Sequence, residues 1–118
     1  MEENRYIQVL FKKPNRNPKK VTIENSLEAM QRLVDGSIEV EQIDDILLVS
    51  NKDKNLKKVE PNVELKNNTI YGSFFIAGND YENADFISLS KRLYRIFSNK
   101  FAKQKQNIRQ EMECEEME

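Results

Sequence analysis

The sequence predicts one α+β domain, with a mostly antiparallel sheet of about five to six strands, one short helix and a longer C-terminal helix. Three observations predict this class. Segments that alternate apolar and polar residues recur along the chain, and polar turns separate them. Two other segments, one after Asn25 and one after Ser88, repeat apolar residues at helical spacing. The 118 residues suffice for one modest hydrophobic core.

The first element expected is an N-terminal β-hairpin. RYIQVLFK (5–12) places Ile7, Val9 and Phe11 on one face of a strand, because side chains alternate with a period of two. The prolines and asparagines of KPNRNP cannot continue that strand, and KVTIE (20–24) then resumes the alternation. The sequence therefore predicts two strands joined by a long basic loop.

A short helix of about ten residues is expected next. Asn25 can cap its N-terminus, and Glu28 three residues later completes a capping box. Gly36 lies just past its end, where a left-handed residue can satisfy the last carbonyls. The residues on its apolar face are Leu27, Met30, Leu33 and Val34.

A second hairpin is expected around the turn Asp44-Asp45. Before the turn, Ile38 and Val40 alternate with glutamates and are expected to point inward. After it, the run ILLVSN (46–51) is almost continuously apolar, which predicts a central strand that is covered on both faces.

One further central strand is expected over TIYGSFFIAG (69–78), after an irregular loop that includes Pro61-Asn62. Its alternation puts a phenylalanine on each face. Gly78 is expected to adopt a left-handed conformation that turns the chain at Asn79. A phosphate-binding loop is disfavoured here, because Gly72 and Gly78 do not precede a helix closely.

The last elements expected are a short return strand, FISL, and a helix that begins at Ser88 or Ser90. The single domain is expected to span residues 1–101, and residues 102–118 are expected to form a polar helical extension and an acidic tail. The helical residues expected to pack on the sheet are Leu93, Ile96, Phe97 and Phe101.

The chain lacks the residues that common catalytic sites use. It has no histidine and one cysteine, which removes Ser-His and Cys-His nucleophiles and cysteine-based metal sites. We expect no catalytic residues, no metal and no cofactor. A metal-dependent enzyme that uses Asp44, Asp45, Asp80 or Asp85 ranks last among the alternatives, because a polar hairpin loop explains the acidic residues that follow Gly78.

The N-terminus MEENRYIQ carries acids where a signal peptide has basic residues, and no apolar run reaches the roughly 20 residues of a membrane span. We therefore expect a cytoplasmic protein with no membrane contact, in the host cell if a phage encodes it.

Charge is strongly segregated along the chain, although the net charge is −1. Residues 12–20 carry five cations and no acid, residues 91–109 carry seven cations and no acid, and the tail is glutamate-rich. Such blocks are most often solvated faces or tails. Clustered cations can also neutralise phosphates, and nearby tyrosines can stack on a base.

Several strings resemble a known family: IENSLEAMQRLVDGSIEV, LKKVEPNVEL and YGSFFIAGNDYENADFISLS. They resemble a family of small domains of unknown function from phages, plasmids and conjugative elements (family 3846 of that series), over roughly residues 5–97. Members often carry a Pro-x-Asn-Arg segment, whereas Val63 follows Pro61-Asn62 here.

The resemblance implies an accessory protein of a phage or mobile element. One expectation is that such a protein acts against host defence. Such a protein would bind a host protein or sequester a small signalling molecule, including a nucleotide-derived one, as a homo-oligomer in some cases. The alternative is a nucleic-acid-binding protein that uses the basic loop and the basic C-terminal helix, against which the acidic tail would compete. The candidate binding residues are Tyr71, Arg92, Tyr94, Arg95, Lys100, Arg109, Lys12, Lys13 and Arg16.

Overall fold

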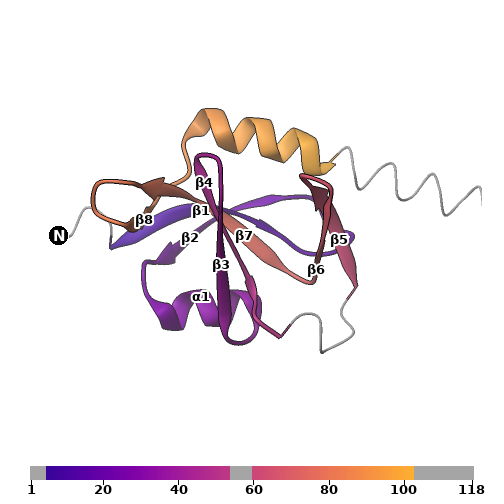
Figure 1. Ribbon diagram of the computed structural model, residues 1–118, viewed down its shortest axis with the longest axis horizontal. Helices are drawn as coiled ribbons and strands as arrows, with labels where there is room; N and C mark the ends of the chain where they lie inside the picture. Colours follow the sequence, from indigo (N-terminus) through magenta and orange to yellow (C-terminus); the bar gives the residue numbers. More distant parts are fainter. Residues whose placement is uncertain (1–4, 54–59, 103–118) are drawn as a thin grey trace, which may run out of the picture.

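The structure is a computed structural model that describes residues 5–53 and 60–102 (Figure 1). The elements in chain order are β1 (Tyr6–Lys12), β2 (Lys19–Glu24), α1 (Leu27–Val34), β3 (Ile38–Ile43), β4 (Ile46–Asn51), β5 (Pro61–Leu65), β6 (Asn68–Tyr71), β7 (Phe74–Asp80), β8 (Asp85–Ile87) and a C-terminal helix described over 91–102. The larger sheet has the order β2-β1-β7-β4-β3, with β8 paired to β7, and all of its pairs are antiparallel. The predicted α+β class and antiparallel sheet are confirmed.

The strand β7 lies at the centre of this sheet, between β1 and β4. Phe74 and Ile76 point into one hydrophobic core, and Phe75 and Ala77 point into the other. All four side chains are 0% exposed. The prediction of a central strand with both faces covered is therefore confirmed for β7, and also for β4, which pairs with β7 and β3.

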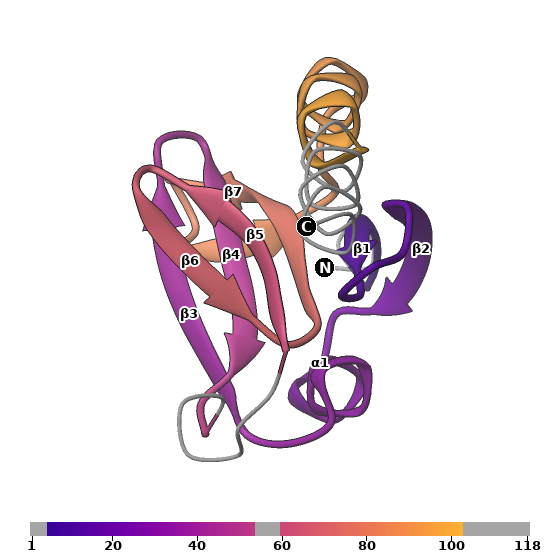
Figure 2. The ribbon, with the colours of Figure 1, turned by 90° about the vertical axis from the view of Figure 1, so that its right-hand side faces the viewer.

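Separate elements cover the two faces of the sheet (Figures 1 and 2). On one face α1 buries Met30 and Val34 against β1, β4 and β7. On the other face lie the C-terminal helix and the β5–β6 hairpin. Phe101 is 0% exposed and its ring meets Phe74 edge-on, with centroids 5.5 Å apart. This contact fixes the helix over the sheet.

Three predictions of inward-facing side chains are wrong. Leu27, expected on the apolar face of the short helix, is 58% exposed, because it is the first residue of α1. Ile96 is 47% exposed, because the buried stripe of the C-terminal helix runs instead through Leu93, Tyr94, Phe97 and Phe101. Val40 is 44% exposed, because β3 is the outermost strand on its side of the sheet.

The single strand expected over residues 69–78 is in fact two strands. Gly72 has φ 73°, in the left-handed region, and its N–H donates to the Glu60 carbonyl at 2.8 Å. The chain turns there, so β6 leaves the larger sheet and pairs with β5. The irregular loop expected at Pro61-Asn62 is also wrong, since these residues begin β5.

Gly78 does not turn the chain, contrary to the prediction. It lies inside β7, and a Cβ at this position would stand 2.7 Å from the Ser88 carbonyl oxygen. A side chain is excluded there because the segment after β8 passes close over the strand. The turn follows later and ends at Ala84, which has φ 51°.

The predicted N-cap of α1 is shifted by one residue. Ser26, not Asn25, has extended backbone angles, and its hydroxyl oxygen accepts from the Ala29 N–H at 3.2 Å. Asn25 instead donates its side-chain amide to the Phe86 carbonyl at 3.3 Å, which connects this end of β2 to β8.

The predicted C-cap of α1 is also shifted. Asp35, with φ 60°, is the left-handed residue, and Gly36 follows it with φ 150°. Asn51 of β4 donates its amide to the carbonyls of Val34 at 3.1 Å and Asp35 at 2.9 Å, so a neighbouring strand satisfies the helix end. The helix has eight residues rather than ten.

The C-terminal helix begins after Ser90, one of the two predicted starts. The Ser90 hydroxyl accepts from the Leu93 N–H at 3.2 Å, and its carbonyl accepts from the Tyr94 N–H at 2.8 Å. The predicted extension beyond residue 102 and the acidic tail lie outside the described residues.

Lys12 and Asn62 form a buried polar pair beneath the β5–β6 hairpin. Lys12 is 1% exposed and Asn62 is 3% exposed. The Lys12 ammonium donates to the Asn62 side-chain oxygen at 2.9 Å and to the Lys13 carbonyl at 2.7 Å. The Asn62 amide donates to the carbonyls of Lys12 at 3.0 Å and Gly72 at 2.7 Å. Asn62 thereby joins the end of β1 to the turn before β7.

We predict that Asn62→Ala lowers the free energy of unfolding by about 2 to 4 kcal/mol, because it leaves a buried ammonium without one of its acceptors and the Gly72 carbonyl without a donor. Urea denaturation followed by circular dichroism measures the loss. Asn68→Ala, an exposed asparagine of β6, is the matched control and should change stability by at most about 0.5 kcal/mol. Equal effects of the two variants would contradict the structural role of Asn62.

Candidate functional site

The exposed basic residues of the first hairpin divide between two clefts, one on each face of β2. Lys19 and Lys20 are neighbours in this strand and therefore point to opposite faces. Lys20 is opposite Leu10 and faces the C-terminal helix, whereas Lys19 is opposite Phe11 and faces α1.

The first cleft, called the helix cleft below, lies between β2 and the C-terminal helix and has a volume of about 330 Å³. It is lined by Lys20, Lys91, Tyr94, Arg95, Ser98 and Asn99. The five helical residues fall on one face because they recur at helical spacing. Tyr94 is half-buried and packs against the core, so its ring has a fixed position on the helix.

The Lys20 ammonium lies 5.2 Å from the centroid of the Tyr94 ring. This is a cation–π contact, and it connects the edge strand to the helix. Three cations line the helix cleft, and no carboxylate lines it. Its field therefore favours an anion, and the Tyr94 ring offers an aromatic surface beside the charges.

The second cleft, called the loop cleft below, lies between the β1–β2 loop, β2 and α1, and has a volume of about 560 Å³. Phe11, Val21 and Leu33 give it an apolar floor, and Lys13, Arg16 and Lys19 surround that floor together with Asn17. The Lys13 ammonium lies 5.9 Å from the Phe11 ring centroid. No carboxylate lines this cleft either.

The structure distributes the predicted binding residues over several places. Tyr94 and Arg95 line the helix cleft, and Lys13 and Arg16 line the loop cleft. Arg92 and Lys100 are exposed on the C-terminal helix and line neither cleft. Tyr71 is 37% exposed at the end of β6 and also lines neither cleft.

Two predicted residues are not at the described surface. Lys12 is 1% exposed and its ammonium donates a hydrogen bond to the Asn62 side chain, so Lys12 lies in the interior. Arg109 lies outside the described residues. The prediction missed Lys20 and Lys91, although both belong to the basic blocks, because only the packing of the helix beside β2 brings them together.

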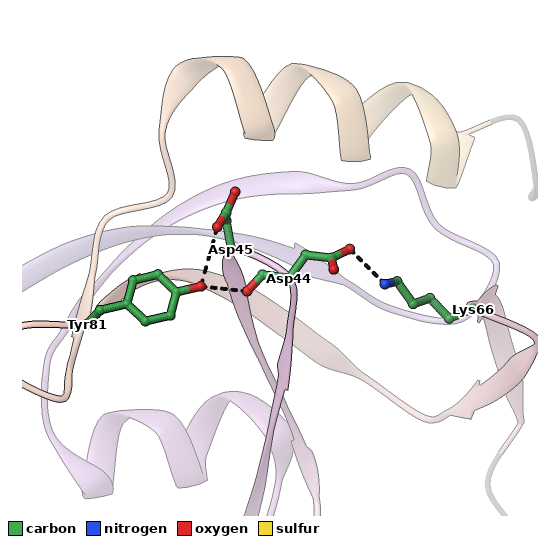
Figure 3. A network of polar contacts seen from close by, with 4 residues as sticks. All are labelled: Asp44, Asp45, Lys66 and Tyr81. Carbon is green, nitrogen blue, oxygen red and sulfur yellow. Dashed lines mark hydrogen bonds and ion pairs between the residues drawn. The ribbon is translucent and has the colours of Figure 1, made fainter.

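The carboxylates considered for a metal-dependent enzyme take part in contacts between turns (Figure 3). The Tyr81 hydroxyl donates to the Asp44 carbonyl at 2.7 Å and to the Asp45 carboxylate at 3.3 Å. The Lys66 ammonium lies 2.8 Å from the Asp44 carboxylate. Within residues 5–53 and 60–102, no three histidine, cysteine, aspartate or glutamate side chains gather closely enough to hold a metal ion.

Asp80 organises the turn between β7 and β8. One of its carboxylate oxygens accepts from the Glu82 N–H at 3.1 Å and the Asn83 N–H at 3.3 Å, and the other accepts from the Asn83 side-chain amide at 2.8 Å. The hydrogen bond from the Asn83 side chain is the main reason that the pKa of Asp80 lies below its ordinary value of 3.8, and the two backbone hydrogen bonds lower it further.

We predict that an NMR titration of the Asp80 carboxyl carbon gives a pKa below 3.8, and that Asn83→Ala raises this pKa toward 3.8. Because the pKa is lowered in the folded protein, the contribution of Asp80 to stability is present at neutral pH and is lost as the pH falls through that pKa. A pKa at or above 3.8 in the unmodified protein would contradict this description of the turn.

Among the residues that the structure describes, no helix has the length and apolar character needed to cross a membrane.

Comparisons with known proteins give one match. The family model for a domain of unknown function, DUF3846, matches residues 7–102 of the 118. No curated protein and no solved structure matches the chain.

Proposed function

The chain belongs to the DUF3846 family, which is defined by a domain of unknown function, and from the geometry of the helix cleft we propose that it is a non-enzymatic protein that binds a small phosphorylated ligand. The family is the one that the sequence resembles. The observation that carries the proposal is the lining of the helix cleft, in which three cations and an aromatic ring occur without a carboxylate.

The charges in the helix cleft suit a phosphate or a diphosphate group. Lys91 and Arg95 project from successive turns of the same helix, and Lys20 reaches the cleft from β2. An arginine can donate two hydrogen bonds to one phosphate, and the two lysines add charge that is less directional. An anion bound there would contact two separate elements, which favours specific binding over a general attraction to one basic surface.

The aromatic ring favours a ligand that carries a base. The Lys20 ammonium lies over the Tyr94 ring, so a planar heterocycle would stack on this ring in place of Lys20, while its phosphates meet Lys20 and the other cations. The cleft volume of about 330 Å³ lies at the lower end of the range for small-molecule sites. A nucleotide-derived molecule is therefore the ligand class that we propose.

We propose binding without turnover because the cleft lacks the groups that chemistry would need. Its charged residues are all cations, its neutral polar side chains are Tyr94, Ser98 and Asn99, and the chain has no histidine to act as a general base. A serine without a neighbouring base is a weak nucleophile.

The wider role stays a prediction. An origin in a phage or mobile element, a host partner, a cytoplasmic location and a role against host defence come from the resemblance and the composition. A small protein that sequesters a phosphorylated signal would fit that role, since sequestration needs affinity but no catalysis.

Nucleic acid is the second candidate ligand, and the loop cleft is the observation that favours it. Lys13, Arg16 and Lys19 lie on the opposite face of β2 from the helix cleft. A strand longer than a single nucleotide could cross the tip of this hairpin and contact both sets of cations, whereas a small ligand would use only one.

We predict that Arg95→Gln weakens the binding of ADP, used as the probe, by about tenfold in calorimetric titrations at low salt, because it removes a charged donor from the cleft. Tyr94→Ala should also weaken binding, and Tyr94→Phe should retain it, because the ring rather than the hydroxyl is proposed to stack. Arg92→Gln is the matched control, since Arg92 is an exposed arginine of the same helix outside the cleft.

Equal losses for Arg92→Gln and Arg95→Gln would show a general charge effect and would contradict the proposed site. Hydrolysis of ATP by the purified protein, followed by phosphorus NMR, would contradict the absence of turnover. For the second candidate, the affinity for a single-stranded oligonucleotide should fall more steeply with salt than that for ADP, and Arg16→Gln should weaken only the oligonucleotide.

A further inference from the structure

The strand β2 ends the larger sheet on one side. It pairs with β1 along its whole length, from Glu24 opposite Tyr6 to Lys19 opposite Phe11, and no described strand lies beyond it. Figure 2 shows β2 at the margin of the molecule, with α1 and the C-terminal helix on either side of the sheet rather than over this edge. An open edge of this kind is a template for another strand.

The hydrogen bonds of β1 show which groups of β2 point outward. The Gln8 N–H donates to the Ser88 hydroxyl at 2.9 Å, and the Gln8 carbonyl accepts from the Leu89 N–H at 2.9 Å. Gln8 therefore directs both backbone groups away from β2. Thr22 is its partner across the antiparallel pair, so the N–H and C=O of Thr22 point away from β1, toward the open edge.

The same alternation extends to both ends of the strand. Asn25 donates its N–H to the Arg5 carbonyl at 2.6 Å, so the backbone groups of Asn25 point toward β1 and those of the preceding residue, Glu24, point outward. The backbone groups that point away from β1, toward the open edge, therefore belong to Lys20, Thr22 and Glu24. The Glu24 carbonyl also accepts from the Ser26 N–H at 2.9 Å, which marks the end of the strand.

We propose that two copies of this chain pair antiparallel through β2, about a two-fold axis that passes between Thr22 of one copy and Thr22 of the other. A two-fold axis makes every contact reciprocal, so that a residue which meets a second residue of the other copy is met in return, and only a residue beside the axis meets its own counterpart. With Thr22 opposite Thr22 of the second copy, the outward N–H and C=O groups of the two threonines satisfy one another. The two sheets then become one continuous sheet.

The side chains of β2 are complementary in this register. Lys20 comes opposite Glu24 of the second copy, and the reverse pair forms on the other side of the axis. On the face toward α1, Val21 comes opposite Ile23 of the second copy. Both are partly buried apolar residues at the margin of the core that α1 covers, so the pairing would extend that core across the axis.

The other open edge, β3, lacks this complementarity. The Ser37 carbonyl accepts from the Lys52 N–H at 2.8 Å, and Ile43 pairs with Ile46 across a two-residue turn. Ile38, Val40 and Gln42 therefore point their backbone groups outward. A two-fold pairing through Val40 would set Glu39 opposite Glu41 of the second copy, and like charges directly opposite each other are destabilising.

Pairing of β2 with β3 of another copy would give a different assembly. Both strands run in the same direction, because four successive antiparallel pairs separate them in the sheet. Their union would be parallel and would repeat without closing. The charges on β2 favour the closed dimer, because Lys20 and Glu24 of one copy pair with Glu24 and Lys20 of the other.

The proposed dimer does not depend on the proposed ligand. An axis perpendicular to the sheet keeps the helix clefts of both copies on the same face, on either side of the paired strands. Lys20 would then be shared with Glu24 of the second copy, which leaves Lys91 and Arg95 as the main cations for an anion. Failure of the dimer and failure of the ligand site can still be distinguished, because the oligomeric state is measured without ligand.

Sedimentation equilibrium tests the dimer with the full chain in the absence of added ligand. The expected mass at increasing protein concentration approaches twice the 13.9 kDa of the chain. Thr22→Pro removes one outward N–H without removing a bond to β1, and it should give the monomer mass. Val40→Pro is the matched control, since it removes an outward N–H from the β3 edge, and it should leave the dimer intact.

Charge exchange provides a second test that does not alter the backbone. Lys20→Glu and Glu24→Lys should each weaken the dimer by about tenfold, because each places like charges opposite one another twice. The double variant Lys20→Glu with Glu24→Lys should restore the dimer. The proposal is overturned by a monomer at every concentration, by masses that grow beyond the dimer, or by a failure of the double variant to restore association.

Discussion

Phe74 and Phe75 lie side by side in β7, point to opposite faces of the sheet, and are both completely buried. A strand with a large apolar ring on each face needs a cover on both sides. The fold supplies these covers from different parts of the chain, α1 on the face of Phe75 and the C-terminal helix with the β5–β6 hairpin on the face of Phe74. The three-layer arrangement follows from this one strand.

The position of the helix cleft follows from how the Phe74 face is covered. Phe101 packs edge-on against Phe74, and Phe97 packs against Phe101 with centroids 5.8 Å apart. These rings hold the C-terminal helix along the sheet, so that its basic side meets Lys20 of β2. The same covers leave the edge of β2 open. The core packing thus determines both the proposed anion site and the proposed interface.

Much of this arrangement could be predicted from apolar periodicity. The period of two gives most of the strands, but it cannot reveal that Gly72 turns the chain, because an alternating pattern continues through it. Charge blocks direct attention to Tyr94 and Arg95, which line the helix cleft, yet they also include Lys12. That lysine is buried because it continues the inward alternation of Leu10 in β1, and Asn62, its partner, is 50 residues away in the sequence. Contacts between residues so far apart in the sequence depend on tertiary packing, which apolar periodicity does not predict.

We propose that the helix cleft binds a phosphorylated ligand between β2 and the C-terminal helix. Backbone amide NMR of the labelled protein during a titration with pyrophosphate tests it most directly, because it locates binding without any substitution. We expect saturable shifts concentrated at residues 19–21 and 91–99, the two segments that form the helix cleft. Shifts that are absent, or that spread evenly over all exposed lysines and arginines, would contradict it.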